Sequence, residues 1–288
     1  MLTSAARVPA SAAPENAIIR PTNAFRRAGL VVFCVAVIAL ASAPLLLPKP
    51  TAREIRQQLW AELQPVPLAN CEMRRFGSPN DGGYLMCGNL LGAVQAAYSY
   101  GIGPFDDWGC DVSQNLGVTV HQYDCFMPPP SPCPRAVFHN ECIGPRTAVI
   151  ESRVFDSLTR QMSKNGDAGK TFVVKIDIEG AELDSLLATP DSVLQRIDQL
   201  AMEIHGADKR FLRMVRKLKR TFHPVHIHFN NQACTVRFKP FPAAAYQVLF
   251  VNKQIAVVDP HQRRPTLPHP LDAPDYALGR DCQTPLEP

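Results

Sequence analysis

Polar residues and glycines follow several apolar stretches of this chain at the points where those stretches end. The clearest case is KIDIEGAE, Lys175 to Glu182, in which carboxylates close a run of valine and isoleucine. A carboxylate is costly to bury without a partner, so such residues are expected at the end of an element, where they are paired, hydrated or directed at a ligand. The residues in such positions are Gly101, Ile102, Gly103, Asp124, Asp177, Glu179, Glu203 and His205.

These residue types point to ligand binding and to proton transfer. A turn of glycines such as Gly101–Gly103 lets a ligand approach the backbone closely. An acid about 20 residues further along, here Asp124, is in position to accept hydrogen bonds from both hydroxyls of a ribose. A histidine close to an acid, here His205 after Glu203, is suited to remove a proton near neutral pH. The alternative for His205 is a structural hydrogen bond to a neighbouring loop.

Alternating strand-like and helix-like stretches must position these groups. The alternation predicts one α/β domain, Rossmann-like, with a mainly parallel sheet and helices on both faces. Ligands of such sheets bind beyond the carboxyl ends of the strands, so we expect the polar strand ends to meet in one cleft. Expected strands are 96–103, 118–124, 136–140, 171–180, 199–206, 224–231 and 246–252, and expected helices are 152–166, 181–188 and 208–222.

Composition confines the folded part to a single domain. The chain has 288 residues, and its net charge of +4 gives no electrostatic reason to expect a nucleic-acid partner. Its 27 prolines gather in the N-terminal arm, in a loop near residues 128–134 and in the C-terminal tail. We therefore expect the domain over residues 70–253, preceded by a stem or linker helix over 48–69 and followed by a proline-rich tail over 254–288.

An apolar segment without charges, residues 28–47, is long enough to cross a bilayer as a helix. Arg26 and Arg27 precede it and favour a cytosolic tail over residues 1–27. We therefore expect a single-pass, type II membrane protein with its domain in the lumen of the endoplasmic reticulum or Golgi. Two alternatives stay open: a cleaved signal peptide, since Ala41–Ala43 resembles a cleavage site and would give a secreted protein, and a mitochondrial presequence, since acids are scarce in this region.

Cysteine usage fits an oxidising compartment. Of the nine cysteines, Cys34 lies in the apolar segment, which leaves an even number for disulfides, and the sequence does not select their pairing. The closely spaced cysteine pairs of a zinc site are absent from the sequence, and we expect no metal ion. A disulfide between Cys71 and Cys87 would tie down the hairpin whose tight turn Asp81–Tyr84, DGGY, predicts.

Several segments taken together resemble S-adenosylmethionine-dependent methyltransferases of the FkbM-like and methyltransferase 22/24-type families. The resemblance rests on CEMRRFGSPNDGGYLMC, YSYGIGPFDDWG, QYD, KIDIEGAE, MEIH and HIHFNN, and it spans Cys71 to about Asn252. It implies a seven-stranded sheet whose last strand is antiparallel, with S-adenosyl-L-methionine lying across the first two strand ends. It also implies O-methylation, and the lumenal setting suggests a glycan or another small-molecule acceptor.

The resemblance further implies roles for individual residues. Gly101–Gly103 match the turn under the methionine part of the cofactor, and Asp124 matches the acid that binds its ribose. Asp177 matches the position that faces the sulfonium, where a positive ligand favours a charged carboxylate. Glu179 is expected at the same site, and with Asp177 and His205 it completes the expected catalytic residues.

Other polar groups have simpler interpretations. His226 and His228 alternate on one face of a strand, a spacing that suits a metal ion, but an exposed polar face is the simpler prediction. The basic run Lys209–Arg220 favours a solvated helix face over an anionic ligand. Lys175 and Glu182 are expected to pair with neighbouring charges or to cap the following helix.

Two other functions stay open. A Golgi glycosyltransferase shares the expected membrane topology, and IDIE resembles its metal-binding acid motif, although the glycine turn and Asp124 are not needed there. The other function is that of a non-catalytic binding protein in the lumen that has the methyltransferase fold. Stabilisation by S-adenosylhomocysteine or by a nucleotide sugar with manganese separates the two enzymes, and cofactor binding without turnover identifies the third possibility.

Overall fold

The computed structural model describes residues 49–282, and the expected cytosolic tail and apolar segment 28–47 lie outside the described residues. Within residues 49–282, none of the helices is both long and apolar enough to cross a membrane. The membrane anchor and its two alternatives therefore stay predictions.

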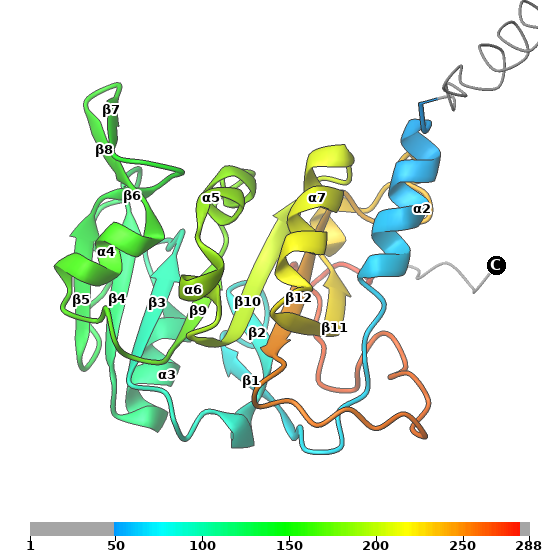
Figure 1. Ribbon diagram of the computed structural model, residues 1–288, viewed down its shortest axis with the longest axis horizontal. Helices are drawn as coiled ribbons and strands as arrows, with labels where there is room; N and C mark the ends of the chain where they lie inside the picture. Colours follow the sequence, from blue (N-terminus) through cyan, green and yellow to red (C-terminus); the bar gives the residue numbers. More distant parts are fainter. Residues whose placement is uncertain (1–48, 283–288) are drawn as a thin grey trace, which may run out of the picture. The chain divides into compact units, whose positions relative to one another are not determined.

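A seven-stranded sheet forms the centre of the described part (Figure 1). Its strands are β3 (Ala96–Tyr100), β4 (Thr119–Asp124), β5 (Ala136–Asn140), β9 (Phe172–Ile176), β10 (Ile197–His205), β11 (Phe222–Phe229) and β12 (Ala245–Asn252). From one edge to the other they follow the order β11-β12-β10-β9-β3-β4-β5. β12 runs antiparallel to both of its neighbours, whereas the other pairings are parallel. The fold is therefore a mixed, Rossmann-like α/β fold.

The two central strands, β3 and β9, are buried along their whole length. β9 reads FVVKI, and such a near-continuous apolar run is typical of a parallel strand covered on both faces. From β3 the chain proceeds outward through β4 and β5 and then adds β9 and β10 on the other side. The strand order thus reverses between β3 and β9, and ligands of such sheets bind beyond the carboxyl ends at this point.

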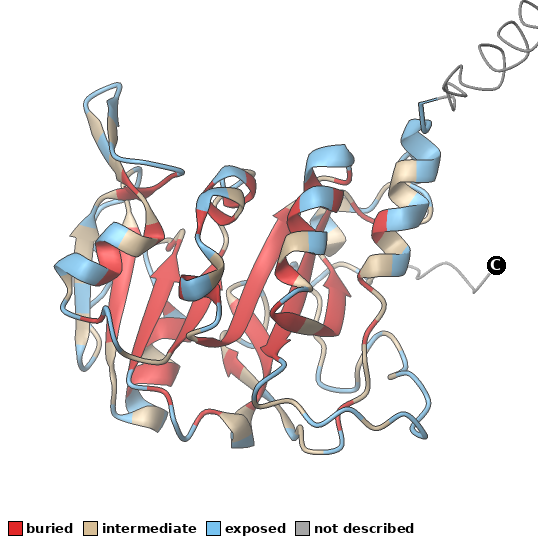
Figure 2. Ribbon diagram, viewed as in Figure 1, coloured by how far each residue is buried: buried red, intermediate tan, exposed pale blue. Residues whose placement is uncertain are grey.

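Helices cover both faces of the sheet, as expected. One face carries α2 (Ala52–Glu62), α4 (Leu158–Lys164), α5 (Glu182–Ala188), α6 (Asp191–Leu194) and α7 (Lys209–Leu218). The opposite face carries α3 (Asp107–Leu116) and the hairpin of β1 (Met73–Gly77) and β2 (Gly83–Cys87) (Figure 1). Buried apolar side chains form two clusters, and Figure 2 shows that burial concentrates on the strands and on the helix sides turned toward them.

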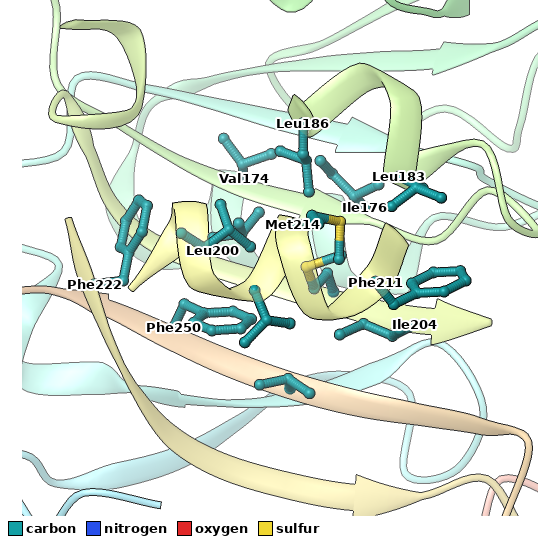
Figure 3. Close-up of a cluster of buried hydrophobic side chains, with 14 of the residues drawn as sticks. Val174, Ile176, Leu183, Leu186, Leu200, Ile204, Phe211, Met214, Phe222 and Phe250 are labelled. Atoms are coloured by element: carbon teal, nitrogen blue, oxygen red, sulfur yellow. The ribbon is translucent and has the colours of Figure 1, made fainter. Parts of the chain in front are cut away.

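Helix α7 illustrates how an amphipathic sequence becomes a covering helix. Phe211, Met214, Val215 and Leu218 are buried and recur three or four residues apart, so they lie on one side of the helix. They pack with side chains of α5, β9 and β10 in the cluster drawn in Figure 3. Burying each such side chain contributes about 1.5–3 kcal/mol to stability.

The basic run on α7 is partly engaged by the fold, which differs from the predicted solvated face. Arg216 and Lys219 bind the carboxylate of Glu62 on α2 at 2.9 and 2.7 Å. Lys217 donates a hydrogen bond of 2.9 Å to the backbone carbonyl of Leu186 near the end of α5. The cations therefore join three helices, and they fasten the predicted stem helix to the rest of the fold.

The region predicted as one helix over residues 152–166 divides into two elements. Its first part forms β8 (Arg153–Asp156), which joins β6 (Cys142–Ile143) and β7 (Ala148–Ile150) in a small three-stranded sheet. Helix α4 begins after Ser157, whose side chain accepts a hydrogen bond from the backbone N–H of Arg160. The helix prediction is wrong for the first part, because Ser157 is an N-cap and marks where the helix starts.

Residues 254–282 pack against the sheet although they lie beyond the predicted domain. His226 Nε2 lies 2.8 Å from Asp272 Oδ1, and His228 Nε2 lies 3.3 Å from Asp281 Oδ1. Both histidines are only 4% exposed, so the prediction of an exposed polar face is wrong. The reason is that carboxylates of the tail partner these imidazoles and make their burial tolerable.

Four disulfides join the cysteines of the described part: Cys71–Cys87, Cys110–Cys133, Cys125–Cys142 and Cys234–Cys282. The first closes the β1–β2 hairpin, which confirms the disulfide predicted there. A disulfide restricts the unfolded chain and typically stabilises a fold by about 2–4 kcal/mol. Disulfides persist in oxidising compartments, so the pairing indicates a secretory or extracellular environment.

Candidate functional site

A cavity of about 580 Å³ opens where the central parallel strands end. Its size is typical of a small-molecule site, and most of its lining is apolar. The disulfide Cys125–Cys142 forms part of the wall. The cavity brings together six of the residues that the sequence singled out, namely Gly101, Ile102, Gly103, Asp124, Asp177 and Glu179. The other two, Glu203 and His205, do not line it, but His205 Nε2 lies 3.9 Å from Asp177 Oδ1 and 3.5 Å from Glu179 Oε2.

The two glycines of the turn are needed for different reasons. Gly101 has a φ of +70°, and a Cβ there would lie 1.5 Å from the carbonyl oxygen of Asp177. This glycine is therefore required by the close approach of the chain after β3 to the chain after β9. A Cβ on Gly103 would meet no heavy atom within 4 Å among the described residues. Gly103 therefore leaves space beside the cavity that a ligand can use.

Asp124 organises the neighbouring backbone. Its Oδ2 accepts a hydrogen bond from the N–H of Ile102 at 3.0 Å. Its Oδ1 accepts hydrogen bonds from the N–H groups of Phe126 and Met127 at 2.8 and 3.0 Å. A carboxylate offers about four acceptor positions, so about one remains for a ligand hydroxyl. The predicted contact with both hydroxyls of a ribose would require one of these backbone bonds to give way.

Asp177 connects the cavity to a second group of polar side chains. Its Oδ2 accepts a hydrogen bond from the hydroxyl of Tyr84 at 2.9 Å, and Lys175 Nζ lies 3.8 Å from the same oxygen. Its Oδ1 faces His205 Nε2 at 3.9 Å. Asp177, Glu203 and His205 together form what we name the acidic cluster. The name reflects the two carboxylates that flank a single imidazole.

His205 is surrounded by carboxylates. Its Nε2 lies 3.5 Å from Glu179 Oε2, and its Nδ1 lies 3.4 Å from Glu182 Oε1. Burial alone would lower the pKa of His205, but Glu182, Glu203 and Asp177 outweigh it and raise the pKa. The surrounding carboxylates therefore favour the protonated form of the imidazole. A base must start neutral, so the predicted role of His205 as general base needs a ligand that offsets these acids.

Glu182 is a site residue that the sequence interpretation understated. It is completely buried, its Oε2 accepts a hydrogen bond from the N–H of Gly180 at 2.8 Å, and its Oε1 accepts one from the N–H of His205 at 3.0 Å. One carboxylate therefore ties the loop after β9 to the end of β10. The loop itself is strained, because Glu179 has a φ of +54°, which residues other than glycine seldom adopt.

Two further residues orient the acidic cluster. Asn230, directly after β11, donates a hydrogen bond of 2.8 Å to Glu203 Oε1. Tyr84 belongs to the DGGY segment, in which the sequence indicated only a turn. The signal for Asn230 is its place at the end of a strand, the same signal that identified Asp177. Tyr84 carries no comparable signal, because it reaches the site only when the hairpin packs on the sheet.

No protein-family model matches this chain, and no curated protein matches it either. The geometry of the cavity and of the acidic cluster is therefore the basis for the functional interpretation.

Proposed function

We propose that the chain is an S-adenosylmethionine-dependent methyltransferase that methylates a hydroxyl group of a glycan or another secretory-pathway acceptor. One observation carries this proposal. A single cavity at the point where the strand order reverses contains the glycine turn, the acid at the end of β4 and the acid after β9. Such a position is where open α/β sheets bind nucleotides. The antiparallel last strand, β12, is a second feature that the resemblance implies, and it supports the same proposal.

The residues present fit the cofactor. Gly103 leaves room for a ligand close to the backbone, and Asp124 keeps about one acceptor position for a ribose hydroxyl. Phe126 and Phe155 give the cavity apolar surface that suits a purine ring. Asp177 supplies a negative charge toward a positively charged ligand. When bound, S-adenosyl-L-methionine supplies a methyl group on an electrophilic sulfonium.

The protein must also accept the proton of the acceptor hydroxyl. Glu179 lines the cavity, its side chain is 88% exposed, and its Oε2 lies 3.5 Å from His205 Nε2. Because Glu179 lines the cavity and His205 does not, Glu179 is the better placed first acceptor of that proton. Alignment of the two reactants inside the cavity supplies the remaining acceleration.

A glycosyltransferase is the second candidate, because the acidic cluster offers donor atoms that suit a metal ion. The two candidates bind different donors. We expect S-adenosylhomocysteine to bind the full chain, purified in detergent, in a calorimetric titration with one site per chain. Saturable binding of a nucleotide sugar with Mn²⁺, without binding of S-adenosylhomocysteine, would replace the methyltransferase proposal by the second candidate.

A further inference from the structure

The acidic cluster has the composition and spacing of an ion site. Asp177, Glu203 and His205 each offer one donor atom, and these three atoms lie within 4.8 Å of one another. We propose that these residues bind a divalent cation, with Mn²⁺ as the best match, directly beside the cavity. This differs from the sequence interpretation, which expected no metal ion.

Glu203 gives the independent indication of a missing ligand. Its side chain is only 4% exposed, and Asn230 satisfies one of its two oxygens, Oε1. The other oxygen, Oε2, receives no hydrogen bond from residues 49–282 and faces His205 Nε2 at 4.0 Å. This oxygen is not among the fully buried polar atoms without a partner, so it keeps some accessible surface and an ion can reach it. A cation placed between the three donor atoms supplies the partner that this oxygen lacks.

The distances within the cluster exclude a hydrogen-bonded network and suit a shared ion. Nε2 of His205 lies 3.9 Å from Asp177 Oδ1 and 4.0 Å from Glu203 Oε2, which is beyond hydrogen-bonding distance. Two ligand atoms that each lie about 2.0–2.4 Å from one ion are separated by at most about 4–5 Å. The observed separations fall within this limit, so small side-chain movements would complete the coordination.

Carboxylates outnumber cationic side chains around the acidic cluster. Four carboxylates, those of Asp177, Glu179, Glu182 and Glu203, lie within 4.0 Å of the imidazole of His205. Lys175 is the nearby cation, but its Nζ donates to the carbonyl oxygen of Tyr100 at 3.3 Å and lies 3.8 Å from Asp177. This excess of carboxylates over cationic groups favours binding of a cation.

The neighbours of the three donors hold them in orientations that suit metal binding. The hydroxyl of Tyr84 donates a hydrogen bond to Oδ2 of Asp177, and Oδ1 faces His205. Glu182 Oε1 accepts a hydrogen bond from the backbone N–H of His205 and lies near Nδ1 without bonding it, and Nε2 is the nitrogen nearest the other two donors. Ligands of metal ions are characteristically supported by such partners.

The donor set also indicates which ion fits. Carboxylate oxygens suit Mg²⁺, Ca²⁺ and Mn²⁺, and an imidazole nitrogen shifts the preference toward first-row transition metals. The thiolates that favour zinc are not available in the described part, because its cysteines form disulfides. Mn²⁺ accepts both donor types and an octahedral geometry, in which three positions would remain open. An acceptor with two adjacent oxygens, such as a vicinal diol, can occupy two of them.

The role of the ion rests on the proposed function. An acceptor hydroxyl bound to a cation loses its proton more readily. Its O–H bond breaks and the proton passes to Glu179 and then to solvent. The oxygen forms a bond to the methyl carbon while the bond between that carbon and sulfur breaks. The products are the methyl ether and neutral S-adenosylhomocysteine.

The test is Mn²⁺ binding by the full chain in detergent after removal of metals with a chelator. Electron paramagnetic resonance of free Mn²⁺ gives the stoichiometry, and we expect one saturable site per chain. At a Mn²⁺ concentration about 100 times its dissociation constant, the melting temperature should rise by about 5–10 °C. Glu203→Gln keeps the acceptor for Asn230 and removes the charge, so it should weaken Mn²⁺ binding at least tenfold. Asp191→Asn, an exposed carboxylate paired with Arg220, is the matched control and should bind like the wild type.

The outcomes separate this proposal from the proposed function. Equal Mn²⁺ affinity in the wild type and Glu203→Gln, or no saturable site for Mn²⁺, overturns the cation site. If Glu203→Gln does not fold, Asp177→Asn gives the same comparison, with disulfide formation and the melting curve as checks of folding. S-adenosylhomocysteine binding is measured separately in the presence of chelator. Its absence together with Mn²⁺ binding overturns the methyltransferase proposal and leaves the cation site standing.

Discussion

The cavity wall and the acidic cluster lie side by side at the same edge of the sheet, but they differ in how their polar groups are satisfied. In the wall, Asp124 accepts three backbone hydrogen bonds, and the rest of the lining is mainly apolar. In the cluster, Glu203 keeps one oxygen without a donor among the described residues, and several acids crowd His205. A buried polar network that is only partly satisfied is costly. The acid of the wall is therefore largely engaged by the protein's own backbone, whereas the cluster keeps an acceptor atom that a ligand can use.

The largest expected effect comes from comparing the two glycines of the wall. Gly101→Ala should destabilise the fold by more than about 4 kcal/mol, because its Cβ would collide with the carbonyl of Asp177 in a left-handed backbone conformation. Gly103→Ala should leave the free energy of unfolding within about 1 kcal/mol and weaken S-adenosylhomocysteine binding at least tenfold, about 1.4 kcal/mol. Urea unfolding and calorimetry measure the two quantities. Similar unfolding energies for both variants would contradict the assigned roles.

Glu182 tests how strongly the cluster depends on its buried support. Glu182→Ala removes two charge-assisted hydrogen bonds, to Gly180 and His205, and should destabilise the fold by about 3–5 kcal/mol. Asp184→Ala on the same helix removes an exposed ion pair with Arg210 and should cost less than about 1 kcal/mol. Chemical unfolding of both variants gives the comparison. A loss at Glu182 no larger than at Asp184 would show that the carboxylate does not hold the two strand ends together.

The wall could largely be predicted from the sequence, and the support of the cluster could not. Gly101, Asp124 and Asp177 each end an apolar run, and parallel strands bring such ends to one edge, so local pattern and sheet geometry suffice. Tyr84 and Asp177 are 93 residues apart, and their hydrogen bond depends on how a hairpin packs on the sheet. The same limit explains the error at His226, whose partner lies in a tail that has no regular pattern. The spacing of apolar residues in the sequence predicts which side chains are buried. It does not predict which polar group each buried polar side chain contacts.

Asp156, next to the cavity, contrasts with Glu203 because hydrogen bonds and an ion pair engage its carboxylate. Burial would raise its pKa, but hydrogen bonds from Lys164, Thr147 and the Ser157 backbone lower the pKa to about 2. A carboxyl group with a lowered pKa contributes stability that is present above its unfolded pKa of about 4 and is lost as the pH falls toward 2. We expect this group to account for about 2 kcal/mol of acid destabilisation between pH 5 and 2.

The pH dependence is checked by comparing the wild type with Asp156→Asn. Urea unfolding across this pH range should show a shallower decline in the variant, because an amide has no proton to gain. The variant should also be less stable than the wild type at pH 7, since it loses the ion pair with Lys164. Parallel declines in the two proteins would mean that Asp156 keeps the same affinity for protons in the folded and unfolded chain.

The smallest expected change in stability comes from two buried tyrosines, one whose hydroxyl has a hydrogen-bond partner and one whose hydroxyl has none among residues 49–282. Tyr84→Phe removes the donor to Asp177 and should cost about 1–2 kcal/mol in stability. Tyr100→Phe should be neutral or slightly stabilising, because the Tyr100 hydroxyl is buried without a hydrogen-bond partner in residues 49–282.

Ligand binding separates the two variants more sharply than stability does. Without the hydroxyl of Tyr84, Oδ2 of Asp177 is no longer held and the carboxylate can turn away from the cluster. Mn²⁺ affinity should then fall by about 10–100-fold, as is usual when a group that orients a metal ligand is removed. Tyr100→Phe should bind Mn²⁺ like the wild type. If both variants bind it equally well, Tyr84 only fills space under the sheet, and the orientation of Asp177 is set by the backbone after β9.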